Sequence, residues 1–125
     1  MIKVGSTLIV LDNCGGRRVK CIKLFNKMPN SYSSVGDIIL VSLKTLRRII
    51  KKKKVKKNTM YLGVIVSTKK HVKRLNGVSV NSLFNYVVIL NKEKNIIGKR
   101  IRGCVFHELR FKGFSKVISI AEGVL

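Results

Sequence analysis

Two apolar runs, residues 61–68 and 84–90, flank an Asn76-Gly77 pair and together predict a β-hairpin. An Asn-Gly pair between β-branched residues favours a two-residue type I′ turn, because both residues adopt positive φ readily. Such a turn fixes the partners across the hairpin: Leu75 with Val78, Lys73 with Val80, and Val66 with Val87. The chain is therefore expected to reverse at this pair and to bring its two apolar runs together.

The outer half of this hairpin differs in chemistry from its apolar root. Residues 69–74 include four cations: Lys69, Lys70, Lys73 and Arg74. A protein core holds so many charges only when each one is paired. The sequence therefore predicts a basic ribbon that extends from the core towards water or an anion.

An excess of positive charge extends over the whole chain. Its 125 residues include 27 Lys and Arg against five Asp and Glu, a formal net charge of +22. Self-repulsion of this size disfavours a compact protein without counter-charge, which indicates a polyanionic partner, with nucleic acid the leading candidate. A hydrophobic content of 46% is still enough for one domain with a core, residues 1–125. No window approaches the roughly 18 to 20 apolar residues of a transmembrane helix, so membrane insertion is not predicted.

Shorter patterns predict three further strands, at residues 7–11, 17–25 and 38–43. Asp12-Asn13 and Gly15-Gly16 separate the first two, and these residue types tolerate a sharp bend. Residues 26–36 are polar, include Pro29 and are predicted to form a loop. Alternation in the second strand is imperfect, with Val19, Cys21 and Lys23 on one face and Arg18, Lys20, Ile22 and Leu24 on the other. Such a strand suits a small β-barrel whose outer face is partly covered or bound to RNA.

Residues 44–57 form the most basic segment of the chain, with sparse apolar residues between the cations. A run of this kind is typically mobile without its partner. The alternative is a merely solvated loop, but charge this dense favours phosphate binding. The predicted phosphate-binding residues are Lys51, Lys52, Lys53, Lys54, Lys56 and Lys57.

The C-terminal region has a different character. We expect an extended piece at 96–102, one or two helical turns at 104–111, and either a helix or a strand at 114–120. Apolar side chains expected to pack on the barrel are Phe106, Leu109, Val117 and Ile118. Cations expected to stay outside are Arg100, Arg102, Arg110, Lys112 and Lys116.

Residues with catalytic or metal-binding chemistry are few. His71 has no acid nearby in sequence, and the side chains of His107 and Glu108 should diverge because they are adjacent. Two histidines without a third ligand do not predict a metal site, and no cofactor is expected. Cys14, Cys21 and Cys104 lack Cys-x-x-Cys spacing and are expected to be reduced and mostly buried. An enzyme is therefore not predicted. Tyr32, Phe84 and Phe106 are interpreted as packing residues, with base stacking the alternative.

Residues 12–23, Asp-Asn-Cys-Gly-Gly-Arg-Arg-Val-Lys-Cys-Ile-Lys, resemble the Asp-Asn-Ser-Gly-Ala-Arg-Arg-Val-x-Cys-Ile-Lys segment of bacterial-type large-subunit ribosomal protein L-fourteen. Similar blocks follow in the same order at 35–39, 64–70, 98–103, 108–110 and 116–125, so the resemblance covers essentially the whole chain. The chain departs from the family pattern at Lys99, where the family has threonine, and at Ser82, where it has an aromatic residue. Its segment 44–57 is also longer and more basic.

The resemblance implies an all-β dominated fold. This is a small five-stranded β-barrel of about residues 1–95, with a protruding basic β-ribbon and short C-terminal helices in residues 96–125. It implies a non-enzymatic constituent of the large ribosomal subunit that binds large-subunit rRNA and bridges to small-subunit rRNA. Implied protein partners are neighbours resembling L-three and L-nineteen, and a ribosome-silencing factor that docks on the C-terminal part.

Two sets of site residues follow from the basic segments and the resemblance together. The expected RNA-binding set adds Arg17, Arg18, Lys20, Lys69, Lys70, Lys73 and Arg74 to the six lysines above. The expected subunit-interface set is Lys99, Arg100, Arg110, Lys112 and Lys116.

Composition also suggests where the protein works. The chain has 14 Ile, 19 Lys and 9 Asn but a single alanine, as expected of an A/T-rich genome. The first residues, Met1-Ile2-Lys3-Val4-Gly5, lead directly into a strand-like segment, so no presequence is expected. A mitochondrial protein is favoured; a plastid or an A/T-rich bacterium remains the alternative.

Two other functions would also explain the charge. One is a non-ribosomal architectural protein that compacts DNA, which would not prefer ribosomal RNA at matched salt. The other is a cationic membrane-surface protein, which should contain an amphipathic helix with a cationic face. Apolar residues in the longest basic run are too sparse for such a helix.

Overall fold

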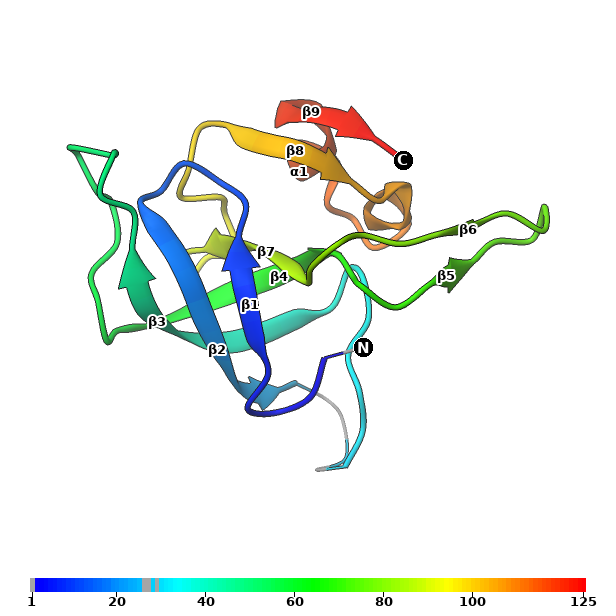
Figure 1. The fold of residues 1–125 in the computed structure, drawn as a ribbon, viewed down its shortest axis with the longest axis horizontal. Helices are drawn as coiled ribbons and strands as arrows, with labels where there is room; N and C mark the ends of the chain where they lie inside the picture. Colours follow the sequence, from blue (N-terminus) through cyan, green and yellow to red (C-terminus); the bar gives the residue numbers. More distant parts are fainter. Residues whose placement is uncertain (1, 26–27, 29) are drawn as a thin grey trace.

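Five strands close into a barrel at the centre of the computed structural model, which describes residues 2–25, 28 and 30–125 (Figure 1). They are β1 (Thr7–Val10), β2 (Gly16–Leu24), β3 (Ile38–Leu46), β4 (Met60–Ser67) and β7 (Tyr86–Leu90). Neighbouring strands are antiparallel except β1 and β7, whose parallel pairing of Ile9 with Tyr86 and Val10 with Val87 closes the barrel. The predicted five-stranded, mostly β fold is confirmed.

Strand β4 explains why part of the barrel has a continuous apolar sequence. Val64, Ile65 and Val66 are all fully buried, although successive residues of a strand point to opposite faces. One face of β4 points into the barrel, and the C-terminal region covers the other, with the Phe106 N–H donating to the Val66 carbonyl at 3.0 Å. A strand covered on both faces needs apolar side chains on both.

The basic ribbon consists of β5 (Val72–Lys73) and β6 (Ser79–Val80) and projects away from the barrel (Figure 1). Its predicted two-residue turn is wrong. Within residues 75–77, Gly77 alone has positive φ, at 84°, and its N–H donates to the Arg74 carbonyl at 3.1 Å. This is a three-residue loop, in which only the last residue needs the left-handed conformation that glycine adopts without strain.

The register differs from the prediction by one residue in the ribbon, because of the longer turn, and again in the barrel. Lys73 pairs with Ser79 instead of Val80, and Val87 pairs with Ile65 instead of Val66. Between these two parts Ser67 pairs with Tyr86 in the predicted register, so the offset within the barrel begins at the irregularity between Ile65 and Ser67. The hairpin itself is confirmed, with an apolar root and an exposed outer part.

A register shift in β2 also corrects the predicted faces of that strand. Val19 and Cys21 are buried as expected, and Ile22 is 38% exposed. After the irregularity between Cys21 and Lys23, the alternation reverses, so that Leu24 is buried and Lys23 is exposed. A β-bulge of this kind adds one residue to a strand and switches which side chains point inward.

The C-terminal region contains a second, two-stranded sheet. Strands β8 (Ile101–Val105) and β9 (Ala121–Val124) pair in parallel, joined through the 3₁₀ helix η1 (His107–Arg110) and the helix α1 (Ser115–Ile120). The extended piece thus lies later than predicted, β9 was not predicted, and α1 settles the open choice at 114–120. No helix in the described part of the chain is long and apolar enough to cross a membrane.

Burial of the C-terminal side chains agrees with the prediction from the sequence, except at one cysteine. Phe106, Leu109, Val117 and Ile118 are all buried, whereas the five cations expected outside are exposed. Cys14 and Cys21 are buried, but Cys104 is exposed because it lies in β8, not in a helical turn, and points outward. Pro29, in the predicted loop at 26–36, lies outside the described residues.

Replacing Phe106 with alanine should destabilise the protein strongly, because this ring is 1% exposed beneath the barrel. We expect Phe106→Ala to lower the free energy of unfolding by about 3–5 kcal/mol, measured by urea denaturation. Phe111→Ala is the matched control, since that ring is 78% exposed, and it should cost less than about 1 kcal/mol. Equal losses in the two variants would contradict this assignment of the core.

Candidate nucleic-acid interface

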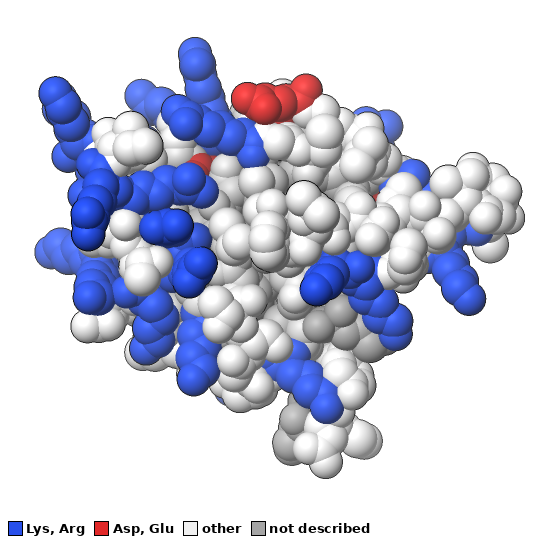
Figure 2. Space-filling model, viewed as in Figure 1, with Lys and Arg blue, Asp and Glu red and all other residues white. Residues whose placement is uncertain are grey.

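The segment between β3 and β4, residues 47–59, is the most basic surface of the molecule, and we call it the lysine loop. Figure 2 shows Lys and Arg side chains gathered on the side of the barrel where this loop lies in Figure 1. The loop is tied to the barrel by backbone hydrogen bonds from Lys54 N to Cys14 O at 2.9 Å and from Asn58 N to Leu43 O at 2.8 Å. Val55 is buried beneath it. The loop therefore has defined contacts with the fold.

Arg47 begins the lysine loop and points its charge inward. Its Nη2 donates to the Val10 carbonyl at 2.9 Å, and its Nε donates to the Gly16 carbonyl at 3.2 Å. Its backbone N–H also donates to Gly15 O at 2.8 Å. Sequence alone did not distinguish this arginine from its basic neighbours, because its role depends on carbonyls more than thirty residues away.

The six predicted phosphate-binding lysines all lie on this loop and are all exposed. Two of them also contact the fold: Lys54 Nζ donates to Ile97 O at 3.3 Å, and the stem of Lys53 lies against Gly15. From β2, Arg17, Arg18 and Lys20 are exposed as well. Arg18 pairs with Thr45 at the end of β3, which places it next to the lysine loop. The structure thus brings two of the predicted basic segments together.

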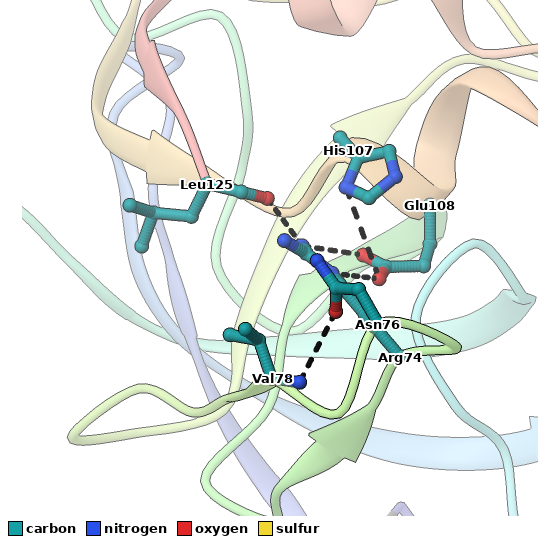
Figure 3. Close-up of polar contacts among 6 residues, drawn as sticks. All are labelled: Arg74, Asn76, Val78, His107, Glu108 and Leu125. Carbon is teal, nitrogen blue, oxygen red and sulfur yellow. Dashed lines mark hydrogen bonds and ion pairs between the residues drawn. The ribbon is translucent and has the colours of Figure 1, made fainter.

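The ribbon carries the third predicted basic segment, but one of its cations is engaged within the protein. Arg74 forms a bidentate pair with Glu108, with Nε 2.8 Å from Oε1 and Nη2 3.3 Å from Oε2 (Figure 3). Its Nη2 also donates to the main-chain oxygen of Leu125. Lys69, Lys70 and Lys73 are exposed. Arg74 therefore holds the ribbon against the C-terminal region.

Glu108 faces two basic groups in this contact. Burial raises its pKa, but the hydrogen bond from Arg74 and the nearby charges outweigh that effect, and the pKa is lowered. His107 Nδ1 lies 3.9 Å from Glu108 Oε1. The expectation that these adjacent side chains diverge is wrong, because the 3₁₀ turn of η1 brings them to the same side.

The ribbon and the residues that follow it also expose apolar side chains. Leu75, Val78, Leu83 and Phe84 are each more than half exposed. In Figure 2 the ribbon, at the right, shows more uncharged than basic surface. Its register and its length beyond the barrel leave these side chains without a core to enter. Of the aromatic residues considered for stacking, Phe106 is buried, whereas Tyr32 and Phe84 are exposed.

The predicted subunit-interface cations fall into groups on the C-terminal side. Lys99 and Arg100 lie in a loop held by Asn13, whose Oδ1 accepts their backbone N–H groups at 2.8 and 3.1 Å. Lys112 and Lys116 line one groove, and Lys116 and Lys99 line the next. Lys94, which the sequence analysis missed, lines the first groove with them. Arg110 lies on η1.

The buried acid and thiol next to β2 have strongly perturbed environments. Burial raises the pKa of Asp12, against hydrogen bonds from Cys14 and Ile89 and the charge of Arg47, which lower it. Burial and the neighbouring Asp12 raise the pKa of the Cys14 thiol to about 12, which leaves it protonated and a poor nucleophile. Within residues 2–25, 28 and 30–125, no group of His, Cys, Asp and Glu could hold a metal ion.

Comparison with protein families gives one finding. A family model described as "Ribosomal protein L14p/L23e" matches residues 1–125. The match therefore includes the barrel, the ribbon, the lysine loop and the C-terminal cations.

Replacing Glu108 with glutamine should loosen the ribbon, because it removes the charge that Arg74 contacts. We expect Glu108→Gln to lower the free energy of unfolding by up to about 1 kcal/mol and to speed amide hydrogen exchange in residues 69–81. Because the pKa of Glu108 is lowered in the folded protein, the difference from wild type should be present at neutral pH. It should then be lost as the pH falls through the range in which this carboxyl protonates. Glu93→Gln, at an exposed turn, is the control and should leave exchange in the ribbon unchanged.

Proposed function

This chain belongs to the ribosomal protein L14p/L23e family, and from that premise we propose that its lysine loop and its ribbon are two separate arms that bind large-subunit rRNA. Membership makes the chain a large-subunit ribosomal protein that binds rRNA and is not an enzyme. The observation that carries the two-arm proposal is the placement of six exposed lysines on a loop whose backbone is bound to the barrel.

The fixed backbone of the lysine loop determines how its lysines can contact phosphates. The backbone of the lysine loop is fixed at several points, while the ammonium groups project into solvent. Such a loop presents positive charge at defined positions, so that contacts with phosphates orient the protein on folded RNA. Arg17, Arg18 and Lys20 of β2 extend this surface, and Lys69, Lys70 and Lys73 supply the second arm. Arg74 contributes by orienting that arm.

The C-terminal cations are the proposed contact with the small subunit. Lys99, Arg100, Arg110, Lys112 and Lys116 are all exposed and are proposed to contact small-subunit rRNA through an intersubunit bridge. A ribosome-silencing factor is proposed to dock on the same side. Neighbouring proteins resembling L-three and L-nineteen are the proposed partners of exposed apolar surface, which the ribbon offers at Leu75, Val78 and Leu83.

The proposed compartment is the mitochondrion. Support comes from the Ile-, Lys- and Asn-rich and Ala-poor composition, which fits the A/T-rich coding of an organelle genome. Fractionation of the source cells tests this: the protein should co-purify with mitochondrial ribosomes, and recovery with plastid or bacterial ribosomes would contradict it.

Co-sedimentation tests the ribosomal role directly. In the organism that makes the protein, it should sediment with isolated large subunits and remain there at the salt concentration that removes loosely bound proteins. Its absence from large subunits would refute the proposal. Preference for duplex DNA over ribosomal RNA at matched salt would instead support a DNA-compacting function.

Neutralising the exposed tip of the lysine loop should weaken rRNA binding in a salt-dependent manner. For Lys51→Gln, Lys52→Gln, Lys56→Gln and Lys57→Gln combined, we expect the slope of log affinity against log salt to become shallower by about 3, since each phosphate contact contributes roughly 0.7 to 0.9. Fluorescence anisotropy with large-subunit rRNA across a salt series measures this slope. Far-ultraviolet circular dichroism should show an unchanged fold. An unchanged slope would show that the tip is merely solvated.

A further inference from the structure

A groove on the C-terminal side lies between the end of β2, the start of β3 and the segment that leads into α1. Its volume is about 710 Å³. It is lined by Phe25, Gly36, Asp37, Ile38, Leu62, Lys94, Lys112 and Phe114. We call it the Phe25–Phe114 groove. It adjoins the groove of Lys112 and Lys116 described above and shares Lys94, Lys112 and Phe114 with it, but its other charged and aromatic residues, Asp37 and Phe25, belong to none of the surfaces assigned above.

The floor of this groove is apolar and includes two aromatic rings. Phe25, Phe114, Ile38 and Leu62 are all partly buried, so each also presents surface to the groove. Lys23 Nζ lies 5.7 Å from the centroid of the Phe25 ring. An aromatic ring beside a cation suits a nucleotide, because the π face of the base can stack on the ring. The phosphate on the attached sugar can then contact the cation.

Two lysines are positioned at this floor by the backbone. The stem of Lys112 lies directly on Gly36, where φ is +89° and a Cβ would collide with Lys112 Cγ. Lys94 has a φ of 64°, which is uncommon for a residue other than glycine. The turn that holds it is fixed by Asn91, whose Oδ1 accepts the N–H groups of Glu93 and Asn95 at 3.0 and 2.9 Å. The stem of Lys112 and the backbone of Lys94 are thereby fixed at the groove that both residues line.

We propose that the Phe25–Phe114 groove binds one unpaired nucleotide of rRNA, with the base against the phenyl rings and the adjoining phosphates at Lys94 and Lys112. The apolar side chains and the two lysines of the lining match the two halves of a nucleotide, and the one acid of the lining, Asp37, already accepts the N–H of Ser34 at 2.8 Å. Base-specific RNA contacts are made mainly with unpaired nucleotides. The acidic side chain of a partner protein would also match the positive charge of the two lysines. Binding of such a side chain would not depend on a nucleobase. This inference rests on the proposed rRNA binding and adds a site to it.

The decisive experiment separates the base from the phosphates. The full-length protein is titrated with a short oligoadenylate strand and with an abasic strand of the same length and charge. Wild type should prefer the base-bearing strand by about tenfold, the effect of one stacked base. Phe25→Leu and Phe114→Leu should lose that preference, whereas Phe111→Leu, at an exposed ring outside the groove lining, should keep it. Equal affinity of wild type for both strands, or no binding of either, would overturn the proposal.

A second pair of variants tests the phosphate contact within one turn of the chain. Lys94→Gln should make the salt dependence of oligoadenylate binding shallower by about 0.7, the value for one contact with a single strand. Lys92→Gln removes the same charge from the same turn but lies outside the groove lining, and it should have a smaller effect. Equal effects of the two variants would show that only general charge matters and would refute the site.

Co-sedimentation and the oligonucleotide titration together show whether the groove proposal or the ribosomal role is wrong. If wild type co-sediments with large subunits but shows no base preference, the groove proposal alone is wrong. If it shows base preference but does not sediment with large subunits, the ribosomal role is wrong and the groove remains a single-strand site. If the Phe25→Leu and Phe114→Leu variants keep base preference but assemble poorly into subunits, a protein side chain occupies the groove.

Discussion

The turn between β1 and β2, residues 11–15, is the point on which the contact of β1 with β7, the lysine loop and the loop of Lys99 and Arg100 depend. Asp12 lies buried in it and accepts N–H groups from Cys14 within the turn and from Ile89 in β7. Burying a carboxyl group is unfavourable unless donors and an opposite charge accompany it. Both are present, because Arg47 approaches from the lysine loop and is itself held by carbonyls at either end of the turn.

The same turn positions two of the surfaces that we propose for ribosomal contacts, the lysine loop and the loop of Lys99 and Arg100. Its carbonyls at Cys14 and Gly15 accept the backbone N–H groups that anchor the lysine loop. Its Asn13 side chain holds the loop of Lys99 and Arg100 on the C-terminal side. Barrel closure, the proposed RNA-binding loop and the proposed subunit interface are therefore coupled through one short segment. This segment also begins the longest block of resemblance in the sequence.

Most of the few acidic residues accept hydrogen bonds from other groups of the protein and do not neutralise the surface lysines. Asp12 and Glu108 have the contacts described above, Asp37 accepts the N–H of Ser34 at 2.8 Å, and Glu122 accepts the N–H of Gly103 at 3.0 Å. The lysines consequently have little counter-charge within the protein, whose net charge is +22. A polyanion is then required to relieve the repulsion, and rRNA supplies it for this family.

Sequence reasoning located the elements and missed the relations between distant residues. Apolar runs and turn residues were enough to predict the barrel strands, the hairpin and the buried Phe106. The register was wrong in the ribbon because Gly77 alone takes positive φ in a longer loop, and it was wrong in the barrel because of the irregularity between Ile65 and Ser67. The faces of β2 were wrong after its bulge. The contacts of Arg47 and Arg74 depend on partners more than thirty residues along the chain, and residue types alone do not reveal such partners.

The Arg74–Glu108 contact illustrates a compromise between charge and order in the ribbon. Strands β5 and β6 pair over only two residues each, and an isolated two-stranded hairpin is marginally stable in water. Using one of four cations to bind Glu108 gives up a potential phosphate contact. It also fixes the direction of the ribbon before RNA binds, so less conformational entropy is lost on binding. For the arm that we propose to bind folded RNA, that order makes the three remaining lysines more effective.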